Sequence, residues 1–384
     1  MSWKEKTVED LRLEFVTAAI SEGANISGLC REYGISRPTG YKWISRYLSG
    51  EPLSDRSHQT AIHPNQTPPK TEQLILDTRA LHPTWGGRKI VRTLRDHGYT
   101  ELPAPSTATA ILRRHDLISQ EESIKHTPYK RFQMKAPNQL WQMDFKGHFA
   151  MMDGTRCHPL TITDDHSRKV LCLDPYDNER WNSVQKSLLR VFSLYGLPDA
   201  ILSDNGTPWA DPVNGYTPYE IWMMQLGILP MHGRPKHPQT QGKTERFHRT
   251  LKEDVLRRRA IADLEEAQRI LTAYRKEYNS ERPHAALDYD VPDKHYHPSS
   301  RKLPEQWGEP EYDVGLTLRK VNCKGYLSVR RHRYYLSESF IGKYLELVSR
   351  PEDLVDIYYG QFRIASIDLN EKRFISKRIF RRDL

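Results

Sequence analysis

Short amphipathic helices account for the first part of the 384-residue chain. Apolar residues at helical spacing predict a helix over Glu9–Ser21, a turn-rich second helix over Ile26–Tyr33 and a third over Arg37–Leu48. Ser36 is a favourable N-cap for the third helix, and Pro38 in its first turn costs no hydrogen bond. A short helix, a glycine turn and a capped helix are typical of a helix-turn-helix.

The third predicted helix carries side chains of the types that reach bases and phosphates in a DNA groove. The candidates for DNA contact are Arg37, Thr39, Tyr41, Lys42 and Arg46. A small helical bundle with an ordinary solvated face is the alternative interpretation.

A second group of three helices follows a linker rich in Pro, Ser, Thr and His. These helices are predicted over Thr71–Leu81, Arg88–His97 and Ser106–Arg114. The candidates for DNA contact are Arg88, Lys89, Arg113 and Arg114. A purely structural spacer is the alternative for this unit.

Residues 123–137 form a basic linker that contains no acid. Lys130 and Arg131 in this linker are candidate phosphate contacts, because aromatic residues interleaved with positive charge suit a nucleic-acid backbone. The same composition would also suit a solvated tether.

From Asn138 the pattern changes to short strands that alternate with helices. Strands are predicted over Leu140–Phe145, His158–Thr163, Lys169–Leu173, Ala200–Ser203 and Ile228–Met231. Helices are predicted over Asn182–Tyr195 and Tyr219–Leu226, and a long helix begins near Thr240. This order indicates a mixed sheet with helices on its faces.

Beyond a proline-rich stretch, closely spaced strands predict a small β-barrel or sandwich. They span Gly325–Val329, His332–Leu336, Tyr344–Val348, Val355–Tyr359 and Phe362–Ile367. The segment Arg319–Arg333 is basic throughout, and Arg330, Arg331 and Arg333 are candidate phosphate contacts. Charged edge strands that resist aggregation are the alternative explanation.

The predicted fold class is therefore a multidomain α/β chain. Its segments are a helix-turn-helix domain at 1–52, a linker at 53–70, a second helix-turn-helix-like domain at 71–120, a basic linker at 121–137, the mixed-sheet core at 138–290, a linker at 291–318 and a β-barrel at 319–384.

Composition narrows the classes of function. The formal net charge is +9 with a pI of about 9.2, which suits a polyanionic partner if the charge lies in patches. No stretch approaches the roughly 18 apolar residues of a membrane helix, and the charged N-terminus lacks the apolar centre of a secretory signal. The four cysteines lie far apart without a CxxC pair, which disfavours a disulfide scaffold and a cysteine zinc site.

Three acids stand out by their position in the predicted elements. Asp144 lies within a strand, Asp204 follows the end of another strand, and Glu245 lies in the first turns of a helix. A sheet that brings both strands beside this helix end would gather three carboxylates, a ligand set that suits Mg²⁺ or Mn²⁺ and not zinc. Solvated surface acids are the alternative. His248, Arg249 and Lys252, at +3, +4 and +7 from Glu245, are candidate DNA contacts on the same helix face.

The motifs around these acids resemble a known family. The segments WQMDF (141–145), SDNG (203–206) and QGKTER (241–246) resemble the catalytic core of retroviral integrases and bacterial insertion-sequence transposases. TITDDHS (161–167) and YNSERPH (278–284) look like further landmarks of that core. Upstream, GISRPT (34–39) and HPTWGGRKI (82–90) resemble the paired helix-turn-helix region of one such transposase group.

This resemblance implies a ribonuclease-H-like core in which Asp144, Asp204 and Glu245 are the catalytic, metal-binding triad. It implies a DNA transposase that binds element ends, cleaves phosphodiester bonds and joins 3′-hydroxyl ends to target DNA with Mg²⁺ or Mn²⁺. The expected partners are double-stranded DNA and a homodimer or higher assembly, in the bacterial cytoplasm near the nucleoid and away from membranes. The N-terminus lacks the His and Cys pairs of the integrase zinc module, so we expect no zinc.

Two other functions stay open, namely a nuclease that only hydrolyses and a DNA-binding regulator with an inactive core. One departure from the family concerns the 40 residues between Asp204 and Glu245, which are a few more than usual. Glu220 and Glu253 are therefore alternative third ligands. Glu245 is preferred because Glu220 lacks the basic helix and Glu253 lies on another face of it.

Overall fold

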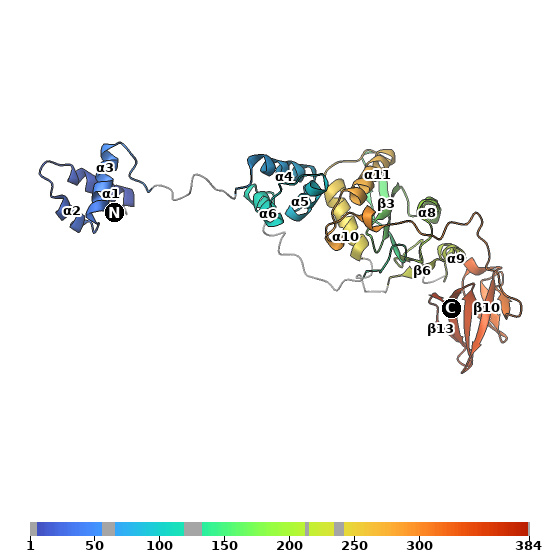
Figure 1. Ribbon diagram of the computed structural model, residues 1–384. Coiled ribbons are helices and arrows are strands. Elements are labelled where there is room, and N and C mark those ends of the chain that lie inside the picture. Colours follow the sequence, from blue (N-terminus) through green and yellow to red (C-terminus); the bar gives the residue numbers. More distant parts are fainter. Residues whose placement is uncertain (1–5, 56–65, 119–132, 212–214, 234–241, 383–384) are drawn as a thin grey trace. The chain divides into compact units, whose positions relative to one another are not determined.

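The structure is a computed structural model that describes residues 6–55, 66–118, 133–211, 215–233 and 242–382 (Figure 1). Their contacts divide the chain into two units, Met1–Gln66 and Thr67–Leu384. In the described part of the chain, no helix is both long and apolar enough to cross a membrane.

The N-terminal unit is the three-helix arrangement that the sequence predicts. Its helices are α1 (Val8–Ala19), α2 (Ile26–Glu32) and α3 (Arg37–Leu48), with Ser36 as the N-cap of α3. The core contains Phe15, Val16, Ala19, Cys30 and Trp43. A Cβ atom on Gly40 would lie 2.7 Å from the Cys30 sulfur, so glycine allows α3 to pack closely on the other two helices.

The second unit begins with another three-helix group, α4 (Pro69–Leu81), α5 (Gly87–Asp96) and α6 (Pro105–Arg114). Trp85, which precedes α5, is fully buried among the apolar side chains of all three helices. A Cβ atom on Gly87 would lie 2.5 Å from Thr109 Oγ1, and this close approach fixes α5 against α6. The predicted second helical group is therefore present in the structure.

A six-stranded mixed sheet follows. Its strands are β1 (Trp141–Phe145), β2 (Phe149–Ala150), β3 (Arg156–Asp164), β4 (Val170–Tyr176), β5 (Ala200–Ser203) and β6 (Leu229–His232). The order is β2-β3-β1-β5-β6, with β4 also paired to β3. β3 runs antiparallel to β1 and β4, whereas β1, β5 and β6 run parallel to one another.

Helices cover both faces of this sheet (Figure 1). On one face, α8 (Trp181–Tyr195) and α9 (Pro218–Gln225) bury a cluster that includes Trp141, Met143 and Phe145 of β1. On the other face, α10 (Gly242–Leu251) and α11 (Leu264–Ser280) pack on Val170 and Leu173 of β4. The predicted fold class of a mixed sheet flanked by helices is confirmed.

The long helix that the sequence predicts from near Thr240, a residue outside the described ranges, is present from Gly242 to Leu256. The α-helical part, α10, ends at Leu251 and continues directly into a π-helical segment at Lys252–Leu256. A non-helical stretch then separates this segment from α11. Ile261 in this stretch is buried against Met151 and Cys157. This stretch is therefore anchored on the β2–β3 hairpin.

The C-terminal part is an antiparallel sheet with a separate hairpin. The strands are β7 (Leu318–Lys320), β8 (Tyr326–Val329), β9 (His332–Tyr335), β10 (Tyr344–Arg350), β11 (Leu354–Tyr359), β12 (Phe362–Asp368), β13 (Arg373–Ser376) and β14 (Phe380–Arg381). The sheet order is β13-β12-β11-β10-β7 with β14 paired to β12, and β8 pairs with β9. The five strands predicted from the sequence correspond to β8–β12, whereas β7, β13 and β14 were not predicted.

Helix α9 belongs to two hydrophobic cores. Tyr219, Trp222 and Met223 pack in the cluster under the mixed sheet, whereas Ile221 and Met224 pack with the C-terminal sheet. A helix that is apolar all round is buried on all sides. The C-terminal sheet therefore shares a core with the mixed sheet through α9.

We predict that Gly215 is required at the contact between α9 and the C-terminal sheet. Its φ is +87°, and a Cβ atom there would lie 2.1 Å from the Leu336 carbonyl oxygen. Gly154 has a similar φ of +83° but nothing within 4 Å, so it is the matched control. Gly154→Ala should cost about 1 kcal/mol of unfolding free energy from backbone strain. Gly215→Ala should cost about 1–3 kcal/mol more from overlap, measured by urea unfolding. Equal losses would contradict the packing described here.

Candidate active site

Asp144 and Asp204 come together because β1 and β5 are parallel neighbours. Trp141 of β1 is paired with Ile201 of β5, and Gln142 is paired with Leu202. Asp144 is the next-to-last residue of β1 and Asp204 directly follows β5, so both acids lie at the same edge of the sheet.

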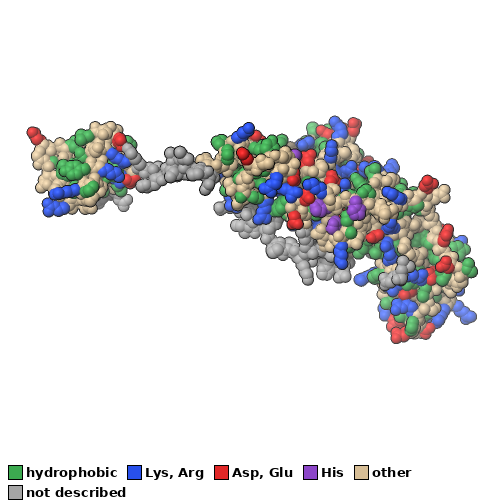
Figure 2. All heavy atoms as spheres, viewed as in Figure 1, with side chains coloured by type: hydrophobic (Ala, Val, Ile, Leu, Met, Phe, Trp, Pro, Cys, Tyr) green, Lys and Arg blue, Asp and Glu red, His purple; other side chains and the backbone are tan. Residues whose placement is uncertain are grey.

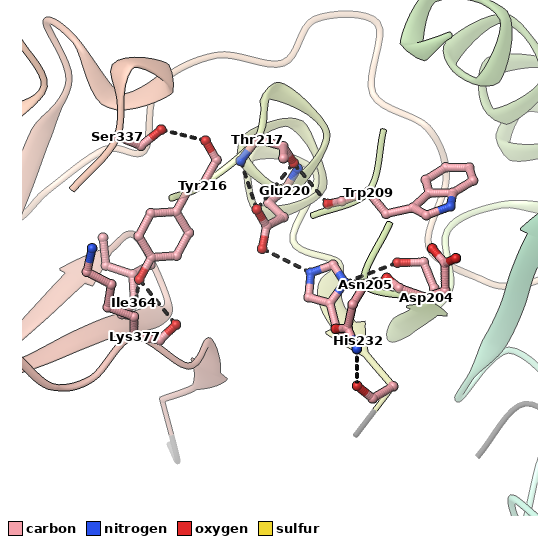
Figure 3. A network of polar contacts seen from close by, with 12 residues as sticks. Asp204, Asn205, Trp209, Tyr216, Thr217, Glu220, His232, Ser337, Ile364 and Lys377 are labelled. Carbon is pink, nitrogen blue, oxygen red and sulfur yellow. Dashed lines mark hydrogen bonds and ion pairs between the residues drawn. The ribbon is translucent and has the colours of Figure 1, made fainter. Parts of the chain in front are cut away.

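A local turn fixes the orientation of Asp204. Its Oδ1 accepts a hydrogen bond of 3.1 Å from the backbone N–H of Gly206, which is an Asx-type turn. The Asn205 amide donates to the Gly233 carbonyl oxygen at 2.7 Å, which ties the turn to the end of β6 (Figure 3).

Helix α10 places Glu245 beside this sheet edge. Thr244 donates a hydrogen bond to Gln142 Oε1 at 3.0 Å, and Phe247 is buried against β4 and α11. These contacts turn the neighbouring Glu245 outward, and its side chain is exposed. Glu245 therefore lies in the first turn of a helix that is fixed directly to the strand of Asp144.

The electrostatics of Asp144 couple the three predicted acids. Burial and, after it, the negative charge of Asp204 raise the pKa of the Asp144 carboxyl to about 7. Glu179 and Glu245 add smaller contributions in the same direction. Like charges held close together disfavour the ionised form, and a bound cation would relieve this repulsion.

The donor set fits a divalent cation that prefers oxygen ligands. In the ranges that the structure describes, however, no three His, Cys, Asp or Glu side chains lie close enough together to hold a metal ion. Asp144 and Asp204 would be the first ligands, and Glu245 would complete the set by a movement of its exposed side chain.

The two alternative third ligands are engaged elsewhere. Both carboxylate oxygens of Glu220 are hydrogen-bonded, one to His232 and the other to Thr217 (Figure 3). Glu253 lies in the π-helical segment and forms a 2.6 Å ion pair with Arg257.

The predicted basic face beside Glu245 is divided between surface and interior. Arg249 and Lys252 are exposed, but His248 is only 9% exposed and its Nε2 lies 3.0 Å from Thr161 Oγ1. Burial, together with nearby Lys146, lowers the pKa of His248 to about 3, so its ring is neutral. His248 Nδ1 lies 3.9 Å from Asp144 Oδ2, which places the ring behind the acid.

Sequence reasoning missed two charged groups near Asp144. Glu179, in the loop before α8, influences the Asp144 pKa, and no local motif marks it. Lys146 is half-buried, and burial and Lys252 lower its pKa. Lys146 directly follows the end of β1, so the strand pattern did not include it.

In the N-terminal unit, the predicted DNA-contacting residues differ in exposure. Arg37, Tyr41 and Lys42 are exposed on α3. The Thr39 hydroxyl is hydrogen-bonded to Ser36 at the start of the helix. Arg46 stacks 5.0 Å from the Trp43 ring centroid and donates to a backbone carbonyl, so it is partly engaged within the unit.

In the second helical group, the predicted residues lie on two sides. Arg88 donates to the Tyr289 hydroxyl at 3.3 Å. Burial and, after it, the positive charge of Arg282 lower the pKa of Lys89 to about 7. Arg114 forms a 2.6 Å ion pair with Glu72, and Arg113 is exposed. The structure thus places Arg88 and Lys89 next to residues of the mixed-sheet core.

At the C-terminus, Arg330 and Arg331 form the turn of the β8–β9 hairpin, both with positive φ. Arg330 pairs with Asp353 at 2.7 Å, whereas Arg331 and Arg333 are exposed. Lys130 and Arg131 lie outside the described residues. On the face shown in Figure 2, Lys and Arg side chains are intermixed with acids.

Comparisons with known proteins give the same domain order. Two models described as "Integrase core domain" match residues 134–238 and 226–292. A helix-turn-helix domain matches residues 11–59 and a homeodomain-like domain matches residues 39–112. A model described as "IS481 family transposase, C-terminal domain" matches residues 316–374.

Individual relatives are distant. The uncharacterized 31.7 kDa protein of insertion element IS407 from Burkholderia multivorans is 26% identical over 157 residues, which is 41% of this chain and about half (54%) of that protein. A Geobacillus stearothermophilus protein, named as a proposed transposase for insertion sequence element IS5376, is 21% identical over 91% of this chain and 85% of its own length.

Among solved structures, the simian T-cell lymphotropic virus intasome in complex with a PP2A regulatory subunit matches 82% of this chain and 99% of its own chain. The identity is 17% and the TM-score is 0.37. The HTLV-2 integrase catalytic core in complex with magnesium matches 42% of this chain and 99% of its own at 16% identity and a TM-score of 0.33.

We predict that replacing Asp144 stabilises the metal-free protein at high pH. A carboxyl whose folded pKa lies above its unfolded value of 3.8 destabilises the fold above that value, and the penalty is complete above the folded pKa of about 7. In EDTA at about pH 8, Asp144→Asn should therefore raise the unfolding free energy by about 1–4 kcal/mol, with a smaller gain at about pH 5.

Asp153→Asn is the matched control in the same experiment. The hydrogen bonds from Thr155 lower the pKa of this exposed acid, so its replacement should give no stabilisation. A gain for Asp144→Asn that did not depend on pH would contradict the electrostatic explanation.

Proposed function

The chain has the domain set of bacterial insertion-sequence transposases with an integrase-like core, and from this premise we propose that it cleaves and joins DNA strands. Its helix-turn-helix domains and C-terminal sheet would bind the ends of a DNA element. The mixed-sheet core would cut a phosphodiester bond at each end and join the released 3′-hydroxyl to target DNA.

The observation that carries this proposal is the electrostatic coupling at the ends of β1 and β5. Asp144 is partly buried beside Asp204, and the negative charges of Asp204 and Glu245 add to the effect of burial in opposing ionisation of Asp144. A fold gains no stability from such an arrangement, and ionisable groups perturbed in this way are typical of functional sites. The electrostatic coupling supports the assignment of Asp144, Asp204 and Glu245 as catalytic metal ligands.

The residues present fit Mg²⁺ or Mn²⁺, which prefer carboxylate oxygens. When bound, such ions activate an attacking oxygen and stabilise the leaving oxygen of a phosphodiester displacement. The protein would contribute the rigid strand ends that hold Asp144 and Asp204, and the exposed Arg249 and Lys252 that face a polyanionic substrate.

Two successive displacements account for the reaction. In the first, a water oxygen forms a bond to phosphorus, the bond to the 3′-oxygen breaks, and a 3′-hydroxyl is released. In the second, that 3′-hydroxyl forms a bond to a target phosphorus while a target 3′-oxygen leaves. Phosphodiester bonds are conserved in the second step, so it needs no nucleotide cofactor.

An element has two ends, so we propose that a homodimer or higher assembly acts on double-stranded DNA. A hydrolysis-only nuclease would perform the first displacement alone, and a regulator with an inactive core would perform neither. Precut element ends distinguish these functions, because only a transposase converts them into joined products.

We predict that Asp144→Asn abolishes cleavage and joining while binding to element ends is retained. Loss of a direct ligand should cost more than the roughly 10–100-fold that changes around metal ligands typically cost. Glu265→Gln, an exposed acid in the first turn of α11, is the control and should behave as wild type. Strand-transfer and gel-shift assays measure both properties, and joining by the Asp144 variant would refute the assignment.

We also predict that Arg37→Ala with Lys42→Ala weakens end binding before it affects the chemistry. Both side chains are exposed on α3, and loss of phosphate contacts should reduce the salt dependence of binding. Lys6→Ala is the control, because Lys6 is exposed in the same unit and paired with Glu14. Binding by fluorescence anisotropy at several salt concentrations measures the effect. Unchanged binding would exclude α3 as the reading helix.

A further inference from the structure

A buried polar pair lies directly behind the Asp204 turn. His232 ends β6 and Glu220 lies in the first turn of α9, with side chains that are 20% and 8% exposed. His232 Nε2 lies 3.0 Å from Glu220 Oε1, and its Nδ1 lies 3.1 Å from the Asp204 carbonyl oxygen (Figure 3). The pair therefore connects the start of α9 with the backbone of a predicted metal ligand.

The hydrogen-bonding roles in this pair follow from the atoms involved. A backbone carbonyl oxygen can only accept, so the 3.1 Å bond to Asp204 requires a hydrogen on His232 Nδ1, which also lies 3.3 Å from the Ser203 hydroxyl. His232 Nε2 and the Glu220 carboxyl share a second hydrogen. The other oxygen of Glu220 accepts from Thr217, whose backbone N–H lies 2.8 Å away in the capping box of α9.

These contacts hold the backbone of Asp204, whereas the Asx-type turn orients its carboxylate. His232 reaches the carbonyl oxygen of Asp204, whereas the Asp204 carboxylate accepts from Gly206. Further along the loop, the Thr217 hydroxyl donates to the Trp209 carbonyl oxygen at 3.0 Å. The backbone at Asp204 and at Trp209 is thus held by His232 of β6 and by Thr217, the N-cap of α9.

Stability alone does not account for a polar pair at this position. Transfer of a carboxylate and an imidazole from water into the interior carries a desolvation cost, and apolar side chains of similar volume often stabilise a fold equally well. A buried hydrogen-bonded pair does provide a fixed direction, which apolar packing does not. Here that direction ends at the peptide that orients Asp204.

We propose that His232, held by Glu220, is a positioning residue that fixes the Asp204 peptide so that the carboxylate is presented to the divalent cation. This inference rests on the proposed function, because it assumes that Asp204 is a metal ligand. Groups that orient metal ligands typically affect metal affinity by about 10–100-fold. The effect should therefore be visible in cation binding itself and not only in catalysis.

Two substitutions of His232 each remove one of its hydrogen bonds to Asp204 and Glu220 and keep the other. The amide nitrogen of Asn lies near the position of Nδ1, so His232→Asn can still donate to the Asp204 carbonyl but leaves Glu220 buried without this partner. The amide of Gln reaches the position of Nε2, so His232→Gln keeps the contact with Glu220 and loses the contact with Asp204.

The experiment measures Mn²⁺ affinity by calorimetry and thermal stability for the full-length wild type and both variants. If His232 positions Asp204, the variant that binds Mn²⁺ more weakly should be the more stable of the two. His232→Gln should bind Mn²⁺ about 10-fold or more weakly than wild type, yet be the more stable variant. His232→Asn should bind Mn²⁺ nearly as wild type and be less stable, because a buried carboxylate loses its partner.

Glu220→Gln provides a second comparison if His232→Asn does not fold. Its amide oxygen can still accept from His232 Nε2, whereas its NH2 group then faces the Thr217 N–H and cannot accept from it. Glu220→Gln should therefore be less stable than wild type, while Mn²⁺ affinity stays close to wild type because His232 keeps its contact with Asp204.

Mn²⁺ affinities that follow the order of stability, or wild-type affinity in His232→Gln, would overturn the positioning role. A wild-type protein that binds no Mn²⁺ and joins no DNA would instead overturn the proposed function and, with it, this inference.

Discussion

The parallel pairing of β1 with β5 is the constraint on which the candidate site depends. It places Asp144 and Asp204 at one edge of the sheet, where burial and mutual repulsion raise the Asp144 pKa to about 7. Two carboxylates do not adopt this arrangement by themselves, because like charges separate when they are free to move. The packing of α8 and α9 on one face and of α10 and α11 on the other holds the strands in place against this repulsion.

Helix α9 extends this support beyond the mixed sheet. The hydroxyl of Tyr216, just before α9, donates to the Ile364 carbonyl oxygen, and Ser337 donates to the Tyr216 carbonyl oxygen (Figure 3). The start of α9 is therefore fixed to the C-terminal sheet at the same place where Glu220 reaches His232. The C-terminal sheet and the Asp204 turn are thus connected by a continuous series of packed side chains and hydrogen bonds through the start of α9.

The sequence predicts the parts of this site that depend on local pattern. Strand alternation and the turn after β5 identify Asp144 and Asp204, and most predicted elements agree with the structure to within one or two residues. The burial of His248 was not predicted, because helical spacing gives relative directions around α10 but not which direction faces the sheet. Glu179 and the His232–Glu220 pair were also missed, since their contacts join segments that are distant in sequence.

The same limit applies to the basic residues, because charge type alone does not identify a DNA contact. Lys89 lies near Arg282 and Asp254 of the core, and Thr84 donates to Asp254 Oδ1 at 2.7 Å while Arg282 donates to Oδ2 at 2.6 Å. The part of α5 that carries Lys89 therefore lies against the core, where Lys89 is partly buried and its positive charge is disfavoured. Arg37 and Lys42 on α3 are of the same residue types but are exposed. The degree of burial in the structure, and not the residue type, therefore distinguishes a basic side chain that can contact phosphate from one that is already in contact within the chain.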